Sequence, residues 1–215
     1  MRNLLYSFII MSLGLLPGLS LAVSNSQEAV AYMQKHWAVD NYQLQGKSQD
    51  EAFIKLVGDA DGFVEQFPAD ASVLIWRGII KSTYAGVKGG LGALKYAKSS
   101  RSDLERALEL EPEALNGSAY TSLGTLYFNV PGWPIGFGDN KKAQSLLQKA
   151  LAINPDGIDP NYFYADYLIN KKRFTEAKEH LQRALGAAPR PGRELADQGR
   201  KKEILAALAE VEKHL

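Results

Sequence analysis

Apolar residues recur every three to four positions along almost the whole chain after residue 26, which is the spacing of one face of an α-helix. We find no alternating apolar and polar run of four to eight residues between turn signals, the pattern typical of a half-buried strand. Clusters of glycine and proline divide the apolar pattern into segments of helical length. The sequence therefore predicts an all-α fold.

Two of these helical segments are copies of each other, 34 residues apart. AQSLLQKALAINP begins at Ala143 and AKEHLQRALGAAP begins at Ala177, and they share Ala, Leu, Gln, Ala-Leu and Pro. A third segment, SRSDLERALELEP, begins at Ser100 and keeps the Leu, Ala-Leu and Pro positions. The closing proline cannot continue a helix and restricts the residue before it, so each copy predicts a helix followed by a turn.

The segment before the middle copy has a pattern of its own. Tyr120, Leu123, Gly124 and Tyr127 follow the spacing aromatic-x-x-Leu-Gly-x-x-Tyr. With the 34-residue period, this spacing resembles the tetratricopeptide repeat. The resemblance implies a right-handed superhelical stack of helical hairpins, in which a small residue such as Gly124 lets the two helices of a hairpin cross closely.

Four parts of the chain are expected from these patterns. Residues 69–191 hold three repeats, and residues 23–68 form a divergent N-terminal helical unit. Residues 192–215 form a C-terminal capping helix, which a stacked array needs to shield its last apolar face. Residues 1–22 have a single charged residue, an apolar stretch, a Pro-Gly break and small residues up to Ala22, which indicates a signal peptide.

The expected location follows from this N-terminal segment. Cleavage after Ala22 predicts a periplasmic or secreted protein without stable membrane insertion; an uncleaved anchor is the alternative. The chain has no cysteine, which excludes disulfides and a lipid-modified cysteine at the mature N-terminus. Arg2 is the only charged residue before Val23, so the mature part has as many basic as acidic residues. That balance gives no electrostatic reason to expect a nucleic-acid partner.

Two of the three repeats carry insertions inside the helical hairpin. The small residues of the two helices are 12 positions apart in the last repeat, 19 in the middle repeat and 22 in the first. The glycine-rich insertions fall near residues 85–97 and 130–138. Insertions in repeat arrays map to one face, which is often the binding face.

The second insertion lies in NVPGWPIGFGD, residues 129–139, where we expect Gly136 and Gly138 to supply a bend and Asp139 to be the N-cap of the next helix. This segment, KKAQSLLQKALAINPDGID and NYFYADYL together resemble the T component of tripartite ATP-independent periplasmic (TRAP) transporters. The resemblance implies a periplasmic protein that associates with a solute-binding component and handles hydrophobic solute in an aromatic-lined cavity. The chain lacks the anchoring cysteine of that family, which puts membrane tethering in doubt, and it has only three full repeats.

Aromatic side chains gather around the second insertion, and first helices of such repeats line the concave surface. The candidate ligand- or partner-binding residues are Tyr120, Tyr127, Trp133, Phe137, Phe163, Tyr164 and Tyr167. For Trp133, Ile135 and Phe137 we expect that they fold back and fill a groove as ordinary core. The alternative is that they form the rim of a hydrophobic ligand or peptide site. Exposing all three would forfeit about 1.5–3 kcal/mol for each side chain.

Candidate catalytic and metal-binding residues are sparse. His36, His180 and His214 are far apart and show no ligand spacing. The segments 59–62 and 154–159 lack the acidic pattern of a calcium loop, and KGGLGALK at 88–95, expected as a flexible hairpin insertion, lacks the Gly-Lys-Ser/Thr of a phosphate loop. We therefore expect no cofactor, no metal and no enzyme activity.

The leading hypothesis is a non-enzymatic periplasmic scaffold or binding protein, with an accessory role beside a TRAP transporter implied by the resemblance. Its partner would be a protein, such as a periplasmic solute-binding protein, or a hydrophobic small molecule on the concave aromatic face. One alternative is a structural envelope-assembly protein without ligand. Another is a carboxylate-based hydrolase that uses Asp156, Asp159 and Asp166, although no base–nucleophile pair accompanies them.

Overall fold

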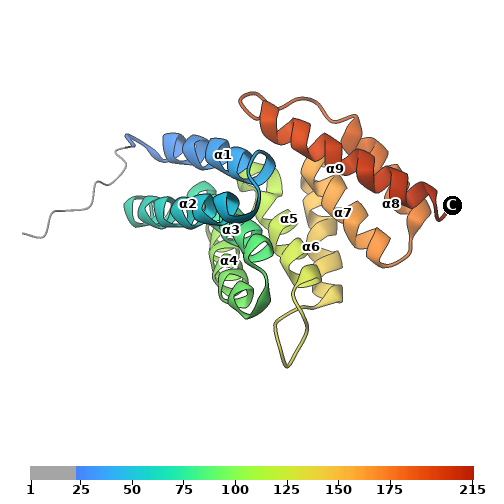
Figure 1. Ribbon diagram of the computed structural model, residues 1–215, viewed down its shortest axis with the longest axis horizontal. Helices are drawn as coiled ribbons and strands as arrows, with labels where there is room; N and C mark the ends of the chain where they lie inside the picture. Colours follow the sequence, from blue (N-terminus) through green and yellow to red (C-terminus); the bar gives the residue numbers. More distant parts are fainter. Residues whose placement is uncertain (1–22) are drawn as a thin grey trace, which may run out of the picture.

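The computed structural model describes residues 23–215, and every regular element in this range is an α-helix. The expected signal peptide, residues 1–22, lies outside the described residues. The helices follow one another as antiparallel hairpins (Figure 1). They are α1 (Ser26–Tyr42), α2 (Gly46–Gln66), α3 (Ala71–Lys88), α4 (Gly90–Leu110), α5 (Ala114–Asn129), α6 (Asn140–Ile153), α7 (Ile158–Asn170), α8 (Phe174–Leu185) and α9 (Glu194–Glu212).

The hairpins stack so that their first helices adjoin. α3 pairs with α4, α5 with α6 and α7 with α8, while α1 contacts α3, α3 contacts α5 and α5 contacts α7. The expected all-α superhelical stack is therefore confirmed. None of the helices in residues 23–215 is long and apolar enough to cross a membrane.

In two of these hairpins, a glycine sets the distance between the two helices. A Cβ atom on Gly124 of α5 would lie 2.8 Å from Cγ of Leu147 on α6. One on Gly78 of α3 would lie 2.8 Å from Cγ of Leu104 on α4. Real Cβ atoms do not approach that closely, so these hairpins cross at their present distance because the side chain is missing.

The first insertion differs from its expected form. Instead of a flexible loop, residues 85–97 continue the two helices, so that α3 ends at Lys88 and α4 begins at Gly90. Gly89 and Gly90 both have φ of +60°, a left-handed conformation that reverses the chain within a residue or two. Helix-forming residues flank this turn, and Tyr96 packs against Tyr84 at a ring distance of 4.7 Å. The extra residues therefore lengthen the hairpin.

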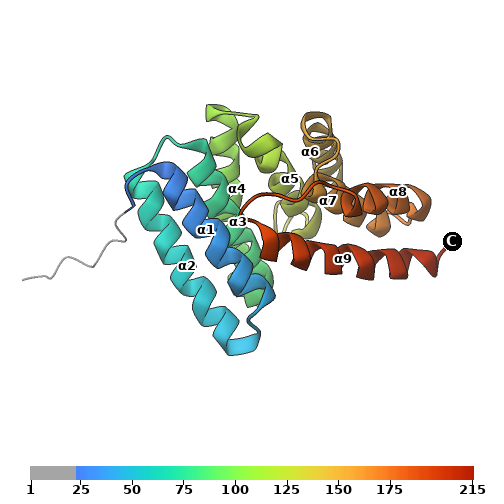
Figure 2. The ribbon, with the colours of Figure 1, turned by 90° about the horizontal axis from the view of Figure 1, so that it is seen from above.

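Helix α9 does more than cover the last repeat. It packs against α7 and α8, and its N-terminal half also contacts α1 (Figure 2). Ala196 is buried in the cluster formed by the N-terminal helices, and a Cβ atom on Gly199 would lie 2.5 Å from the Tyr42 ring. The Tyr42 hydroxyl donates a hydrogen bond of 3.3 Å to Glu203. The capping helix thus joins the two ends of the stack.

Candidate functional site: a concave cavity and a protruding loop

The inner side of the stack holds a cavity of about 1120 Å³ that is open to solvent on one side. Its walls come from α1, α3, α5, α7 and α9, the first turns of α4, and the links from α5 to α6, from α6 to α7 and from α8 to α9. These are mainly the first helices of the hairpins, which form the concave face. α9 contacts both the last repeat and α1, and the link before it forms part of the cavity wall.

Hydroxyl groups of α3 and α5 give the cavity a mildly polar wall. Ser82, Ser118 and Thr125 donate hydrogen bonds of 2.7–2.8 Å to carbonyl oxygens of their own helices. Their protons are therefore already used, and they present mostly oxygen lone pairs and methyl or methylene groups to the cavity. Apolar residues such as Ile79 and Leu126 lie between them. Such a lining suits an apolar or amphipathic molecule.

A network of ion pairs borders the cavity at α7 and α9. Asp159 accepts a hydrogen bond of 2.6 Å from Nη1 of Arg190 and one of 2.9 Å from Nε of Arg200. Arg190 also donates to Asp197, and Arg200 also donates to Glu203. Burial alone would raise the pKa of Asp159, but Arg200 and Arg190 outweigh it and lower the pKa to about 2. This network fixes the α8–α9 link against α7.

A third arginine of the wall, Arg193, stands apart from this network. Its guanidinium lies 4.8 Å from the ring centre of Trp76 on α3, a cation–π contact between the two ends of the stack. Its Nε is buried without a hydrogen-bond partner, as is Nε1 of Trp76. Both residues line the cavity.

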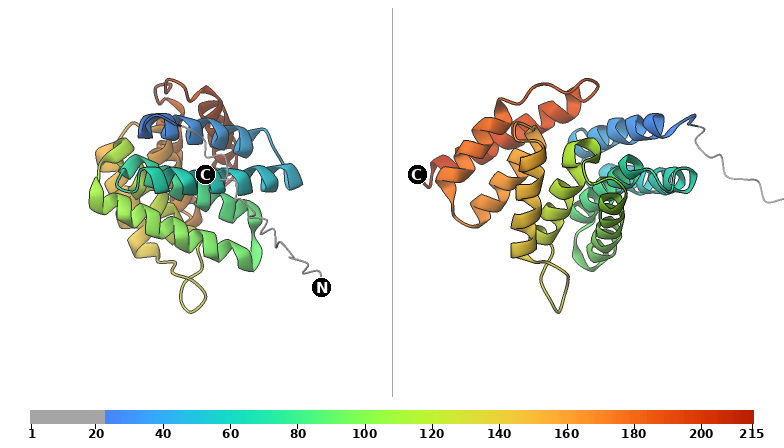
Figure 3. Two further views of the ribbon diagram at one scale, coloured as in Figure 1. Left: turned by 90° about the vertical axis from the view of Figure 1, so that its left-hand side faces the viewer. Right: turned by 180° about the vertical axis from the view of Figure 1, so that it is seen from behind.

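The second insertion forms a loop that projects from the stack between α5 and α6 (Figures 1 and 3). Its neck is tight, because a Cβ atom on Gly138 would lie 1.9 Å from the Val130 carbonyl oxygen. The Gly138 N–H donates a hydrogen bond of 3.0 Å to the carbonyl of Pro131. Asp139 accepts hydrogen bonds from the first backbone N–H groups of α6, as expected of an N-cap. The narrow neck directs the tip of the loop outward.

Only one of the three apolar loop residues folds back. Phe137 is half-buried, with its ring 5.4 Å from Tyr127 and the Arg101 guanidinium 4.5 Å from its centre. Trp133 is 90% exposed and Ile135 is 69% exposed. The expectation that all three fill a groove is therefore wrong for Trp133 and Ile135, because the closed neck keeps the tip away from the helices.

The other candidate aromatic residues lie mainly between helices. Tyr127, Tyr164 and Tyr167 are buried, and Tyr164 stacks on Tyr167 at 6.2 Å. Tyr120 is half-buried with Lys149 5.7 Å above its ring. The structure thus brings several of them together in the core of the α5–α8 region.

Of the seven candidates, Phe163 is the one that lines the cavity. Sequence reasoning missed Trp76, Arg193 and Arg200. A weak signal was available in Arg-Pro-Gly-Arg, residues 190–193, which places two arginines on a tight turn directly after the last repeat.

The acidic residues behind the hydrolase alternative do not form a pair. Asp159 is held by two arginines, Asp156 is exposed, and burial raises the pKa of Asp166. His180 lies 2.9 Å from the Asn161 side chain, between α7 and α8. Within residues 23–215, no three His, Asp or Glu side chains are grouped as metal ligands would be. The described residues therefore lend the hydrolase hypothesis no support.

Comparison with known proteins gives matches of two kinds. Residues 135–210 match the family model of the tetratricopeptide repeat. The structure is similar to a thermophilic TPR protein of Thermus thermophilus, with a TM-score of 0.54 and 15% identity, over 85% of this chain and 100% of that one. A MamA protein matches with a TM-score of 0.45 and 15% identity, over 87% of this chain and 92% of that one. No curated protein sequence matches significantly.

Proposed function

We propose that the chain is a non-enzymatic binding protein, because it is a tetratricopeptide-type helical repeat protein, a kind that generally binds other molecules and does not catalyse reactions. Its ligand is an apolar or amphipathic small molecule held in the concave cavity. The observation that carries this proposal is the cavity of about 1120 Å³. Ligand cavities typically measure about 300–1,000 Å³, whereas a shallow groove would favour a purely structural scaffold.

Filling the cavity is expected to abolish ligand binding. Ser122 lies on α5 in the cavity wall, and Ser122→Trp places an indole in the space. With the neutral fluorescent probe N-phenyl-1-naphthylamine, we expect the wild type to bind and Ser122→Trp to bind at least tenfold more weakly. Fluorescence titration measures both. Gln182→Trp, at an exposed position of α8, is the matched control and retains binding. Equal binding by Ser122→Trp, or none by the wild type, contradicts the proposal.

A protein partner is the second candidate, and the exposed tip of the 130–138 loop favours it. Trp133 is 90% exposed, and exposed tryptophan is often the residue that contributes most to a protein interface. Ile135 of the same loop also lines the cavity, so a partner bound at this tip would lie beside the cavity.

Trp133→Ala separates this role from folding. Since the side chain makes almost no buried contact, the free energy of unfolding is expected to change by less than about 0.5 kcal/mol. Capture of a partner from a periplasmic extract is expected to fall at least tenfold, measured by affinity pull-down. Phe137→Ala is the contrasting variant, because Phe137 packs on Tyr127 and its loss destabilises the fold. Unchanged capture by a folded Trp133→Ala protein removes the loop from the interface.

The place of action that we propose is the periplasm, as an accessory of a TRAP-type transporter. This part of the proposal rests on the N-terminal segment and on the resemblance of residues 118–187 to the T component. Neighbouring genes for a permease and a solute-binding protein would support it, and the solute-binding protein is then the first partner to test in the pull-down.

A further inference from the structure

Three arginines line the cavity, and their surroundings differ. Arg190 and Arg200 each hydrogen-bond to two carboxylates at 2.6–2.9 Å. Arg193 makes no ion pair and no side-chain hydrogen bond with any residue of 23–215. Asp159, Asp197 and Glu203 are already engaged by the other two arginines, and Asp156, an exposed residue of the same wall, makes no ion pair with any residue of 23–215. The Arg193 guanidinium is therefore the wall's unmatched positive group.

The position of this guanidinium is held by the fold. Arg193 is the N-cap residue of α9, its backbone N–H bonds to the Arg190 carbonyl at 3.1 Å, and its side chain stacks on Trp76. Trp76 is itself 4% exposed and packs edge-on against Trp37 at 6.0 Å. A guanidinium on an aromatic platform keeps its plane and loses little entropy when it forms hydrogen bonds.

Two donors at this end of the cavity have no acceptor. Nε of Arg193 and Nε1 of Trp76 are both buried without a partner, although buried donors in proteins are nearly always bonded. Neither of these two atoms is accessible, so a ligand reaches the Arg193 guanidinium through its two terminal nitrogens. A half-buried charge without a counterion is costly, and an anion that brings oxygen acceptors lowers that cost. Polar groups on α3 and α5 and the apolar residues toward Val130 and Ile135 continue the wall away from this point.

From these features, and resting on the proposed function of the cavity, we propose that the ligand is an amphipathic acid. Its anionic group lies against the Arg193 guanidinium beside Trp76, and its apolar body extends along α5 toward the 130–138 loop. The contact is a charge-assisted hydrogen bond, stronger than one between neutral groups. The other two arginines hold the link in place and do not take part.

Displacement of bound N-phenyl-1-naphthylamine by two ligands with the same chain length tests this. Decanoate carries a carboxylate where decan-1-ol carries a hydroxyl. We expect decanoate to displace the probe from the wild type at a concentration at least tenfold lower than decan-1-ol. In Arg193→Met that ratio is expected to fall to about one, with decan-1-ol unchanged. Arg183→Met, at an exposed position on α8, is the matched control and keeps the wild-type ratio.

The possible results separate this inference from the proposed function. A wild-type ratio near one contradicts the proposal that the ligand is an acid. It leaves the proposed cavity function standing, since the probe still binds. A ratio that persists in Arg193→Met places the acid elsewhere and overturns the assignment. A wild type that binds no probe contradicts both. If Arg193→Met does not fold, Arg193→Gln replaces it. A second measurement is the decanoate preference of the wild type at high salt, which we expect to be lost. Salt screens a contact between charges but does not screen an apolar contact.

Discussion

Replacing Asp159 by alanine is expected to lower the free energy of unfolding by about 3 kcal/mol. The carboxylate binds Arg190 at 2.6 Å and Arg200 at 2.9 Å, so its loss leaves Arg200, which is 8% exposed, with Glu203 alone. Breaking a buried ion pair from one side costs about 3–5 kcal/mol. The lower end applies because the Asp159 side chain is 29% exposed. Urea unfolding followed by circular dichroism measures the change.

The neighbouring acidic residue provides the control. Asp156 is exposed and makes no ion pair with the residues of 23–215, so Asp156→Ala is expected to change the free energy of unfolding by less than about 0.5 kcal/mol. Equal effects of the two variants would mean that the network does not hold the α8–α9 link.

Acid is expected to weaken the same ion pairs. The pKa of Asp159 is about 2 in the folded protein against 3.8 as its ordinary value. A lowered pKa contributes stability that is complete above about pH 4 and is lost as the pH falls toward 2. The loss amounts to about 2 kcal/mol. Asp159→Asn has no charge to titrate, so the difference between its unfolding free energy and that of the wild type should shrink over this range.

Local sequence patterns predicted the hairpins because the relevant contacts are local. Gly124 and Leu147 meet within one repeat, and the period of 34 residues shows which helix pairs with which. The same reasoning overestimated the loop between α3 and α4. Two adjacent glycines, Gly89 and Gly90, suffice to reverse the chain, and composition does not show where a helix resumes.

The cavity wall could not be predicted in the same way. Trp76 and Arg193 meet because α9 returns to the N-terminal helices, where Gly199 fits against Tyr42. That return depends on the curvature of the whole stack, which no single repeat encodes. Likewise, the exposure of Trp133 depends on the hydrogen bonds at the neck of its loop, and the apolar character of the segment alone favours burial.

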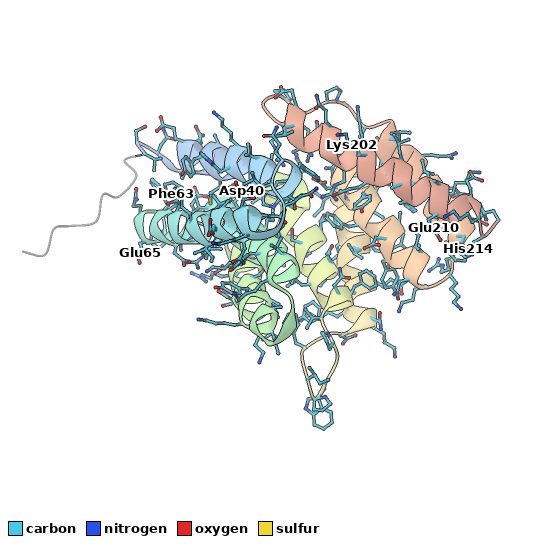
Figure 4. The ribbon with its side chains drawn as sticks, in the orientation of Figure 1. Asp40, Phe63, Glu65, Lys202, Glu210 and His214 are labelled. Atoms are coloured by element: carbon cyan, nitrogen blue, oxygen red, sulfur yellow. The ribbon has the colours of Figure 1, made fainter. Side chains whose placement is uncertain are left out.

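A second large effect is expected at Asp40, in the opposite direction. Figure 4 marks Asp40 on α1, which packs against α2. The residue is 6% exposed, its carboxylate accepts no hydrogen bond from residues 23–215, and it lies two residues before the end of α1. A negative charge is unfavourable in such a place, because burial removes water and the helix C-terminus is itself negative. Asp40→Asn should raise the free energy of unfolding at pH 7 by about 3 kcal/mol.

The pH dependence of this gain identifies its cause. Burial raises the pKa of Asp40 from 3.8 to about 6, Lys55 lowers it and Asp59 raises it. Between about pH 4 and pH 6 the folded protein retains a proton that the unfolded chain has lost, so wild-type stability falls as the pH rises through this range. The advantage of Asp40→Asn should therefore be near zero at pH 4, grow to pH 6 and stay constant above it.

Asp166 and Glu203 also have raised pKa values, but they are the same in both proteins and cancel from the difference. Glu51→Gln, at an exposed position of α2, controls for the loss of one charge. An advantage that does not vary between pH 4 and pH 7 would assign the gain to a new amide hydrogen bond, and the buried charge would not be its source.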